Sequence, residues 1–218
     1  MKLLERFKRQ GLGEVTLSPE FGSDRRGEAA EYHYQLALAL AEDGLYEEAF
    51  AEFQQAIRRG LDTAEAHYNV GLTCAQMNRS TEAIKYYERA INIAPDFAEA
   101  YNNLGIIYSN LGRNVEAIKA YIRAIRIKPD YLEAHNNLGI VYYNCGSYAE
   151  AVKSCQKALK IDPEYSYAHY SLGLIYLDLR DKERAMEEQL ILKNLDQDMA
   201  AQLLDSIQRE FLTRPNMF

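Results

Sequence analysis

The sequence predicts an all-α solenoid of five helix–turn–helix repeats. Three observations support this prediction: a period of 34 residues, columns of small and large residues that follow the period, and prolines in a constant register. Three segments align without gaps at this spacing: AEAHYNVG from Ala64, AEAYNNLG from Ala98 and LEAHNNLG from Leu132. The register extends back to AEYHYQLA from Ala30 and forward to SYAHYSLG from Ser166. A fixed period of about 20–50 residues is the signature of stacked repeats. We expect repeats at 30–63, 64–97, 98–131, 132–165 and 166–198.

The repeat columns predict two closely packed helices in each repeat. Two columns hold only small residues: Ala37, Gly71, Gly105, Gly139 and Gly173, and Ala49, Ala83, Ala117, Ala151 and Ala185. Larger residues alternate with them, and one such column holds Leu36, Val70, Leu104, Leu138 and Leu172. Small residues let helices approach, and large ones fill the remaining space. This pattern therefore predicts an interdigitated core between the two helices.

Turn residues mark where the helices end. Pro95, Pro129 and Pro163 each close one repeat, because proline cannot continue a helix. Within the repeats a turn column holds Gly44, Asn78, Gly112 and Gly146. Each repeat is therefore expected to read as helix, turn, helix.

The two ends depart from the repeat pattern. Residues 199–212 place apolar side chains at helical spacing, which predicts a capping helix over the last repeat, followed by a tail at 213–218. Residues 1–29 are expected to be a flexible or loosely packed leader. Within this leader, residues 2–9 combine Leu3, Leu4 and Phe7 with four basic residues. They are interpreted either as a frayed tail or N-terminal cap, or as a short helix that binds a partner or a membrane surface.

Composition narrows the class of protein. The net charge of −7 disfavours nucleic acid as a partner, and no apolar window is long enough for a transmembrane segment. Cys74, Cys145 and Cys155 form no C-x-x-C pair, which favours a reducing compartment and a cytoplasmic location. No phosphate-binding loop, nucleophile elbow or H-E-x-x-H motif is present, so we expect neither an enzyme nor a cofactor.

The repeat columns resemble the tetratricopeptide repeat (TPR) family, with its small residue after an apolar one, its alanine pairs and its closing proline. The resemblance covers about 170 of the 218 residues. It implies a right-handed superhelix whose first helices line a concave, ligand-binding groove. It also implies that the chain binds other proteins or peptides.

The residues expected to face this groove are rich in amides and phenols. They are Tyr34, Gln35, Tyr68, Asn69, Asn102, Asn103, Asn110, Asn136, Asn137, Asn144, Tyr170 and Ser171. Amides both donate and accept hydrogen bonds, so they can hold a peptide backbone of any sequence. Asn69, Asn103 and Asn137 are similar to the asparagine ladder of the O-GlcNAc transferase superhelix. The alternative is that these asparagines brace neighbouring helices.

Other charged or metal-binding roles for these columns are disfavoured. The groove columns hold no Lys or Arg, which argues against the carboxylate clamp of TPR co-chaperones. His33, His67, His135 and His169 share one column, but adjacent repeats should lie about 8–10 Å apart. Zinc ligands must instead converge to about 2 Å from one ion. We therefore expect no metal site.

Three functions remain open from the sequence. The first is an adaptor or assembly scaffold that binds an extended peptide or a partner helix in the groove. The second is a self-assembling structural protein whose leader or convex face occupies a neighbour's groove. The third is a substrate-recruiting partner of a separate glycosyltransferase, which the asparagine column alone suggests.

Overall fold

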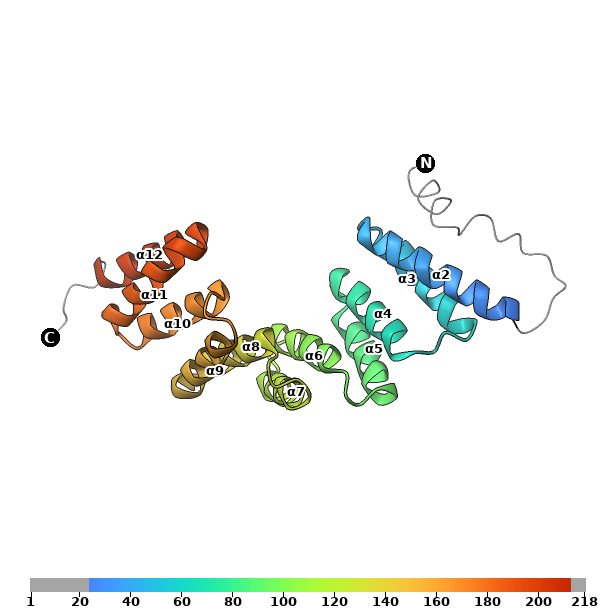
Figure 1. Cartoon of the computed structure of the whole chain (residues 1–218), viewed down its shortest axis with the longest axis horizontal. Coiled ribbons are helices and arrows are strands. Elements are labelled where there is room, and N and C mark those ends of the chain that lie inside the picture. Colours follow the sequence, from blue (N-terminus) through green and yellow to red (C-terminus); the bar gives the residue numbers. More distant parts are fainter. Residues whose placement is uncertain (1–23, 213–218) are drawn as a thin grey trace. The chain divides into compact units, whose positions relative to one another are not determined.

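The computed structural model describes residues 24–212, and this range contains eleven α-helices and no strand. The chain alternates between the first and second helices of successive repeats (Figure 1). The helices are α2 (Asp24–Glu42), α3 (Tyr46–Arg58), α4 (Ala64–Gln76), α5 (Ser80–Ile93), α6 (Ala98–Asn110), α7 (Asn114–Ile127), α8 (Leu132–Asn144), α9 (Tyr148–Ile161), α10 (Ser166–Asp178), α11 (Lys182–Leu195) and α12 (Gln197–Leu212). The predicted all-α solenoid of TPR-type helix pairs is confirmed.

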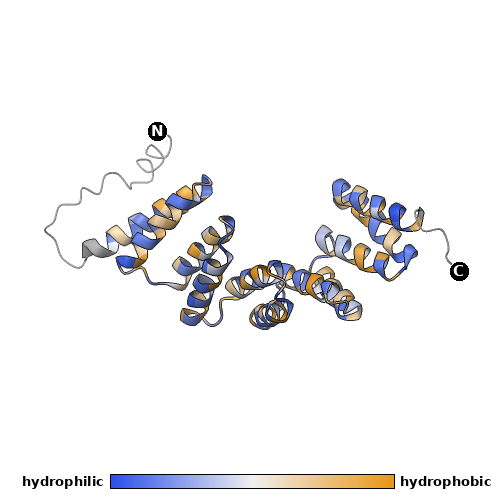
Figure 2. Ribbon diagram, turned by 180° about the vertical axis from the view of Figure 1, so that it is seen from behind, coloured by the Kyte–Doolittle hydropathy of each residue, from blue (hydrophilic) through white to orange (hydrophobic). Residues whose placement is uncertain are grey.

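The helices fall into two compact units, and the boundary between them in the sequence lies within α6. Unit 1 ends at Ile107, and unit 2 begins at Tyr108. In unit 1, α2 packs on α3 and α4 packs on α5. In unit 2, α8 packs on α9, and α10 packs on α11. The second helices α3, α5, α7 and α9 are amphipathic, which Figure 2 shows as polar and apolar stretches along each ribbon.

The small-residue columns lie at the contacts between paired helices. Ala49, Ala83 and Ala151 are fully buried. A β-carbon on Gly71 would lie 2.6 Å from the ring of Tyr87, which is closer than carbon atoms pack. Glycine at this position therefore allows α4 and α5 to approach each other.

The turn column behaves as the sequence predicts. Gly44, Gly112 and Gly146 have positive φ angles of 78°, 70° and 73°. Asn78 occupies the same turn position with φ of 58°, a conformation that asparagine tolerates better than most residues. In the fifth repeat Arg180 takes this place with φ of 61°, so the turn geometry is kept without the favoured residue.

The ends of the described range are helical. α2 begins at Asp24, within the predicted leader, whereas residues 2–9 lie outside the described residues. α12 packs against α10 and α11 and buries Leu203 and Ile207. No helix among residues 24–212 is both long enough and apolar enough to cross a membrane.

Candidate functional site

Two tyrosine–asparagine hydrogen bonds connect successive first helices in unit 1. The Nδ2 of Asn69 on α4 donates to the hydroxyl of Tyr34 on α2 at 2.7 Å. The Nδ2 of Asn103 on α6 donates to the hydroxyl of Tyr68 on α4 at 2.9 Å. Both bonds span 35 residues, so each joins one repeat to the next. These asparagines therefore brace neighbouring helices, which is the structural role left open by the sequence.

Aromatic neighbours hold the two bridging phenols in place. The ring of Tyr34 lies 5.6 Å from that of Phe53, and the ring of Tyr68 lies 4.8 Å from that of Phe97. Partial burial raises the pKa of both tyrosines, and the asparagine hydrogen bonds partly oppose this shift. Both phenols are therefore held in place by ring contacts, and the raised pKa keeps them neutral.

Carboxylates flank the phenols on the same side of unit 1. The charges of Glu65 and Glu31 further raise the pKa of Tyr34, and the charge of Glu99 does the same for Tyr68. Glu31 also accepts a 2.7 Å hydrogen bond from the Nε2 of Gln35. Neither α4 nor α6 contains a Lys or Arg of its own. This surface is therefore acidic.

An apolar column runs along the same helices. Leu38, Leu72 and Ile106 each follow Tyr34, Tyr68 or Asn102 by four residues, which places them one turn further along the same helix face. All three are only half-buried. We call the surface formed by the bridging tyrosines and asparagines, the three glutamates and this apolar column the first-helix face of unit 1.

The sequence prediction did not include the glutamates or the apolar column, although both were visible in it. The glutamate is the second residue of the aligned segments that start at Ala30, Ala64 and Ala98. The apolar residue directly follows the small-residue column. Both features recur with the 34-residue period, which is the signal that could have found them.

Three of the predicted groove residues are buried. Asn102, Asn136 and Ser171 have exposed fractions of 4%, 3% and 7%. Asn136 lies against Cys155, whose Sγ contacts its Oδ1 at 3.9 Å. A ligand on the surface does not reach these side chains, so we do not include them in the proposed binding site.

The remaining predicted residues of unit 2 differ in exposure. Asn137 and Tyr170 are half-buried, whereas Asn110 and Asn144 are exposed. One contact between first helices was not predicted: the hydroxyl of Tyr143 on α8 donates to Oδ2 of Asp178 on α10 at 2.8 Å. It spans 35 residues, as the bridges of unit 1 do, but it uses a carboxylate in place of an amide.

The histidines form hydrogen bonds with their own repeat or with the last residues of the repeat before it. His169 contacts Glu188 through Nδ1 at 2.6 Å and the carbonyl of Pro163 through Nε2 at 2.9 Å. His67 contacts Asp62 through Nε2 at 2.6 Å. Within the described part of the chain, no group of three metal-ligating side chains comes together.

The cysteines occupy two kinds of environment. Cys74 and Cys155 are buried, which raises the pKa of each thiol to about 12. Such thiols are poor nucleophiles, because the thiolate is the reactive form. Cys145 is exposed, and all three thiols are free.

Stacked helix pairs with a period of 34 residues define the class of helical repeat proteins, and comparison with known families gives the particular one. Models described as tetratricopeptide repeat match residues 22–60, 132–165 and 154–187. A model described as TPR repeat matches residues 71–112 and 110–146. The chain belongs to the tetratricopeptide repeat family, whose fold serves as a scaffold for interactions between proteins.

Solved structures of TPR proteins share this fold at low sequence identity. YrrB, described as a TPR protein with an unusual peptide-binding site, is 22% identical, with a TM-score of 0.67 over 84% of this chain and 95% of its own. MamA is 22% identical, with a TM-score of 0.66 over 78% of this chain and 94% of its own. PilF of Pseudomonas aeruginosa is 19% identical, with a TM-score of 0.70 over 87% of this chain and 95% of its own. The comparison with curated proteins finds no match.

Proposed function

We propose that the first-helix face of unit 1 binds an extended, basic and apolar peptide segment of a partner protein. The observation that carries this proposal is the charge of the face: Glu31, Glu65 and Glu99 lie beside the bridging tyrosines, and α4 and α6 contain no cation. Clustered carboxylates attract Lys and Arg side chains and repel acidic partners.

Each part of the face has a role in such a complex. An asparagine amide has two N–H donors and a carbonyl acceptor, and the tyrosine bridge uses one donor. The Oδ1 of Asn103 also accepts a 3.4 Å hydrogen bond from the Nδ2 of Asn102, and an amide oxygen can accept two such bonds. Each bridging asparagine therefore keeps one N–H donor and acceptor capacity for a peptide backbone. Leu38, Leu72 and Ile106 offer apolar contacts to alternate side chains of an extended strand. The peptide-binding site described for YrrB, which shares the fold, supports this class of ligand.

Selection from a random peptide display library tests the proposal. We expect the full chain to enrich peptides in which Lys or Arg alternates with apolar residues. A Glu31→Gln/Glu65→Gln/Glu99→Gln variant should bind these peptides roughly three- to a hundredfold more weakly. This estimate assumes that each exposed ion pair contributes about 0.2–1 kcal/mol and that about 1.4 kcal/mol is a tenfold change.

A matched variant separates the face from the overall charge of the chain. Asp43→Asn/Glu48→Gln/Asp96→Asn removes three exposed carboxylates outside the first-helix face and changes the net charge equally. It should bind the selected peptides as the wild type does. Equal losses in both triple variants would show that only long-range charge matters, and enrichment of acidic peptides would contradict the proposal.

Self-association is a second candidate function, favoured by the sequence of residues 1–10. This segment carries Lys2, Arg6, Lys8 and Arg9 against a single acidic residue, Glu5, and it also contains three large apolar residues. Its chemistry therefore complements the first-helix face. Sedimentation velocity should show a mass that rises with concentration, and Lys2→Gln/Arg6→Gln/Lys8→Gln/Arg9→Gln should abolish the rise. A monomer at all concentrations would exclude this candidate and leave the first one intact.

A further inference from the structure

The residue that faces the histidine column differs between repeats. In repeats 1 and 5 a glutamate lies 19 residues after the histidine, and its carboxylate contacts Nδ1: Glu52 on His33 and Glu188 on His169. In repeat 2 the residue at this position is Tyr86, whose ring stacks on His67 with centroids 5.9 Å apart. Each of these histidines is thus covered by a neighbouring side chain.

In repeat 4 the equivalent position holds Ser154, which is shorter than glutamate or tyrosine. Its hydroxyl donates to the backbone carbonyl of Glu150 at 2.8 Å. His135 is 5% exposed and contacts the carbonyl of Pro129 through Nε2 at 2.9 Å. Among the described residues, Nδ1 of His135 has no hydrogen-bond partner. The place that a carboxylate fills in repeat 5 is therefore open in repeat 4.

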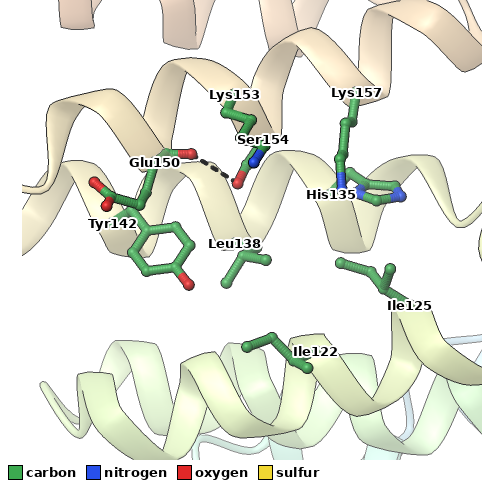
Figure 3. Close-up of a pocket in the computed structure, with 9 residues that line it drawn as sticks. All are labelled: Ile122, Ile125, His135, Leu138, Tyr142, Glu150, Lys153, Ser154 and Lys157. Carbon is green, nitrogen blue, oxygen red and sulfur yellow. Dashed lines mark hydrogen bonds between the residues drawn. The ribbon is translucent and has the colours of Figure 1, made fainter.

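A cavity of about 300 Å³ occupies this place (Figure 3). We call it the repeat-4 cavity. Ile122 and Ile125 of α7 line one side, and Leu138 of α8 lies opposite them. Ile122 is 39% exposed, so the cavity opens at an apolar rim. Its volume is at the lower limit of ligand pockets, which suits a side chain or two better than a complete cofactor.

Two cations border the cavity. Lys153 and Lys157 of α9 both line it, and neither forms an ion pair with any described residue. Glu150 is the one acidic residue of the lining, so the local charge is positive in an otherwise acidic chain. In repeat 2 a cavity lies at the same register, but there Arg89 is already paired with Asp62 at 3.0 Å.

We propose that the repeat-4 cavity binds an acidic side chain of a partner protein, together with a neighbouring branched aliphatic side chain. The partner carboxylate accepts a hydrogen bond from Nδ1 of His135, as the carboxylate of Glu188 does from His169. Lys153 and Lys157 balance its charge, and the aliphatic side chain packs against Ile122 and Leu138. The cavity is built mainly from second helices, so this proposal does not depend on the first-helix face.

The contact between His169 and Glu188 in repeat 5 shows which protonation state of the histidine ring a carboxylate at Nδ1 requires. Both nitrogens of His169 face acceptors, so both must carry protons for both hydrogen bonds to form. His135 already uses Nε2 toward a carbonyl oxygen, so a carboxylate at Nδ1 would complete the same imidazolium arrangement. An amide or hydroxyl ligand has no negative charge that could pair with the imidazolium or with the two lysines.

Titration of the full chain with short peptides, followed by NMR of the histidine ring nitrogens, tests the proposal. The probe is Ac-Ala-Leu-Glu-Ala-NH2, compared with Ac-Ala-Leu-Gln-Ala-NH2 and Ac-Ala-Ala-Glu-Ala-NH2. We expect the first peptide to shift the His135 signals and the glutamine peptide to bind at least about tenfold more weakly, because hydrogen bonds between charged groups are the strong ones. Equal binding of the glutamate and glutamine peptides would overturn the proposal.

Variants of the cavity give an independent test. Ser154→Glu supplies an internal carboxylate at the position of Glu52 and Glu188, so it should abolish peptide binding in a folded protein. Lys153→Gln/Lys157→Gln should weaken binding without filling the cavity. Lys85→Gln, the equivalent of Lys153 in repeat 2, is the control and should leave binding unchanged. If both cavity variants bind the glutamate peptide as the wild type does, the site is not the one proposed.

Discussion

At the scale of single residues, His169 shows how one side chain can make stability depend on pH. Its imidazole lies between the carboxylate of Glu188 and the carbonyl of Pro163. The hydrogen bond to Glu188 is the main cause that raises the pKa of His169 above its ordinary value, although burial opposes the shift. A raised pKa means that the folded state binds this proton more tightly than the unfolded state does.

The sign of the pH dependence follows from this difference. The stabilisation from His169 is complete below the ordinary histidine pKa of about 6.5, and it is lost as pH rises through the folded-state pKa. Glu188→Gln should therefore lower the free energy of unfolding by about 1.5–3 kcal/mol at pH 5.5 and by clearly less at pH 9. Urea denaturation at the two pH values measures this.

Glu183→Gln is the control for that prediction, because Glu183 is an exposed carboxylate on the same helix, α11. It should change the free energy of unfolding by less than about 0.5 kcal/mol at both pH values. An equal cost of Glu188→Gln at pH 5.5 and pH 9 would show that the pair stabilises the fold through packing alone.

At the scale of elements, the contact between α8 and α9 depends on the absence of a side chain at residue 139. A β-carbon on Gly139 would lie 2.6 Å from Sγ of Cys155 and 3.2 Å from the backbone oxygen of Ala151. Gly139→Ala should therefore lower the free energy of unfolding by about 1–3 kcal/mol through overpacking. The higher helix propensity of alanine, about 1 kcal/mol, offsets part of this cost. Urea denaturation at neutral pH gives the net change.

Removing the sulfur identifies which contact causes the loss. In a Cys155→Ala background the closest contact disappears, and the next two nearest atoms both belong to the α9 backbone. Gly139→Ala should then cost less than it does in the wild type, and a double-mutant cycle measures the difference. Identical costs in the two backgrounds would assign the loss to the backbone of α9.

The sequence predicts the positions of helices and turns better than it predicts which side chains are exposed on the surface. The 34-residue period identified the helix pairs and the turn column, because these depend on local backbone geometry that repeats. The exposure of individual groove residues could not be predicted, since Asn102 and Asn103 are adjacent in sequence, yet only Asn102 is buried. The repeat-4 cavity was also missed. It depends on one short side chain, Ser154 of α9, which lines the cavity together with His135 of α8. The repeat columns of the sequence do not show which side chains of two different helices line the same cavity.

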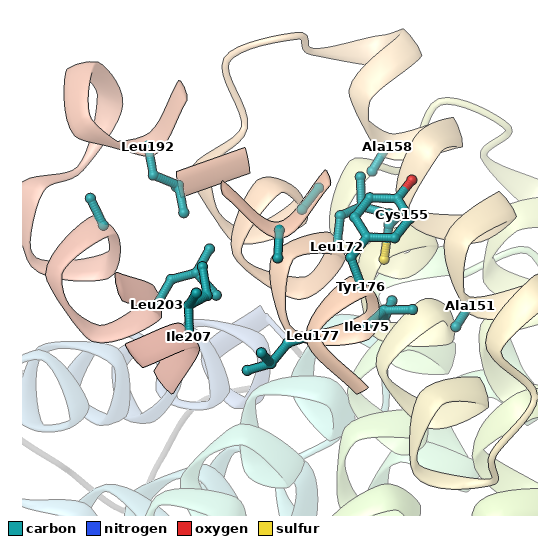
Figure 4. Close-up of a cluster of buried hydrophobic side chains, with 13 residues drawn as sticks. Ala151, Cys155, Ala158, Leu172, Ile175, Tyr176, Leu177, Leu192, Leu203 and Ile207 are labelled. Carbon is teal, nitrogen blue, oxygen red and sulfur yellow. The ribbon is translucent and has the colours of Figure 1, made fainter. Parts of the chain in front are cut away.

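At the scale of the whole molecule, a repeat chain is stabilised mainly by contacts between neighbours in sequence. In unit 2 the helices pack in order, α7 on α8, α9 on α10 and α11 on α12. The last of these contacts belongs to a continuous apolar cluster that includes Leu192, Leu203 and Ile207 (Figure 4). α12 therefore covers apolar surface that the fifth repeat would otherwise expose to water.

Leu203→Ala tests this arrangement, because Leu203 is fully buried and lies directly over Gly173. Deleting its methyl groups should cost about 2–5 kcal/mol locally. Hydrogen exchange should show a loss of protection in α10, α11 and α12 and a smaller loss in α8 and α9. The loss should decrease in this way because each repeat is stabilised only by contacts with its direct neighbours. Leu190→Ala, at a position that is 57% exposed, should leave exchange unchanged throughout unit 2. If Leu203→Ala instead deprotects α8 as strongly as α12, unit 2 unfolds as one cooperative body, and the capping helix stabilises all of its repeats rather than the last one.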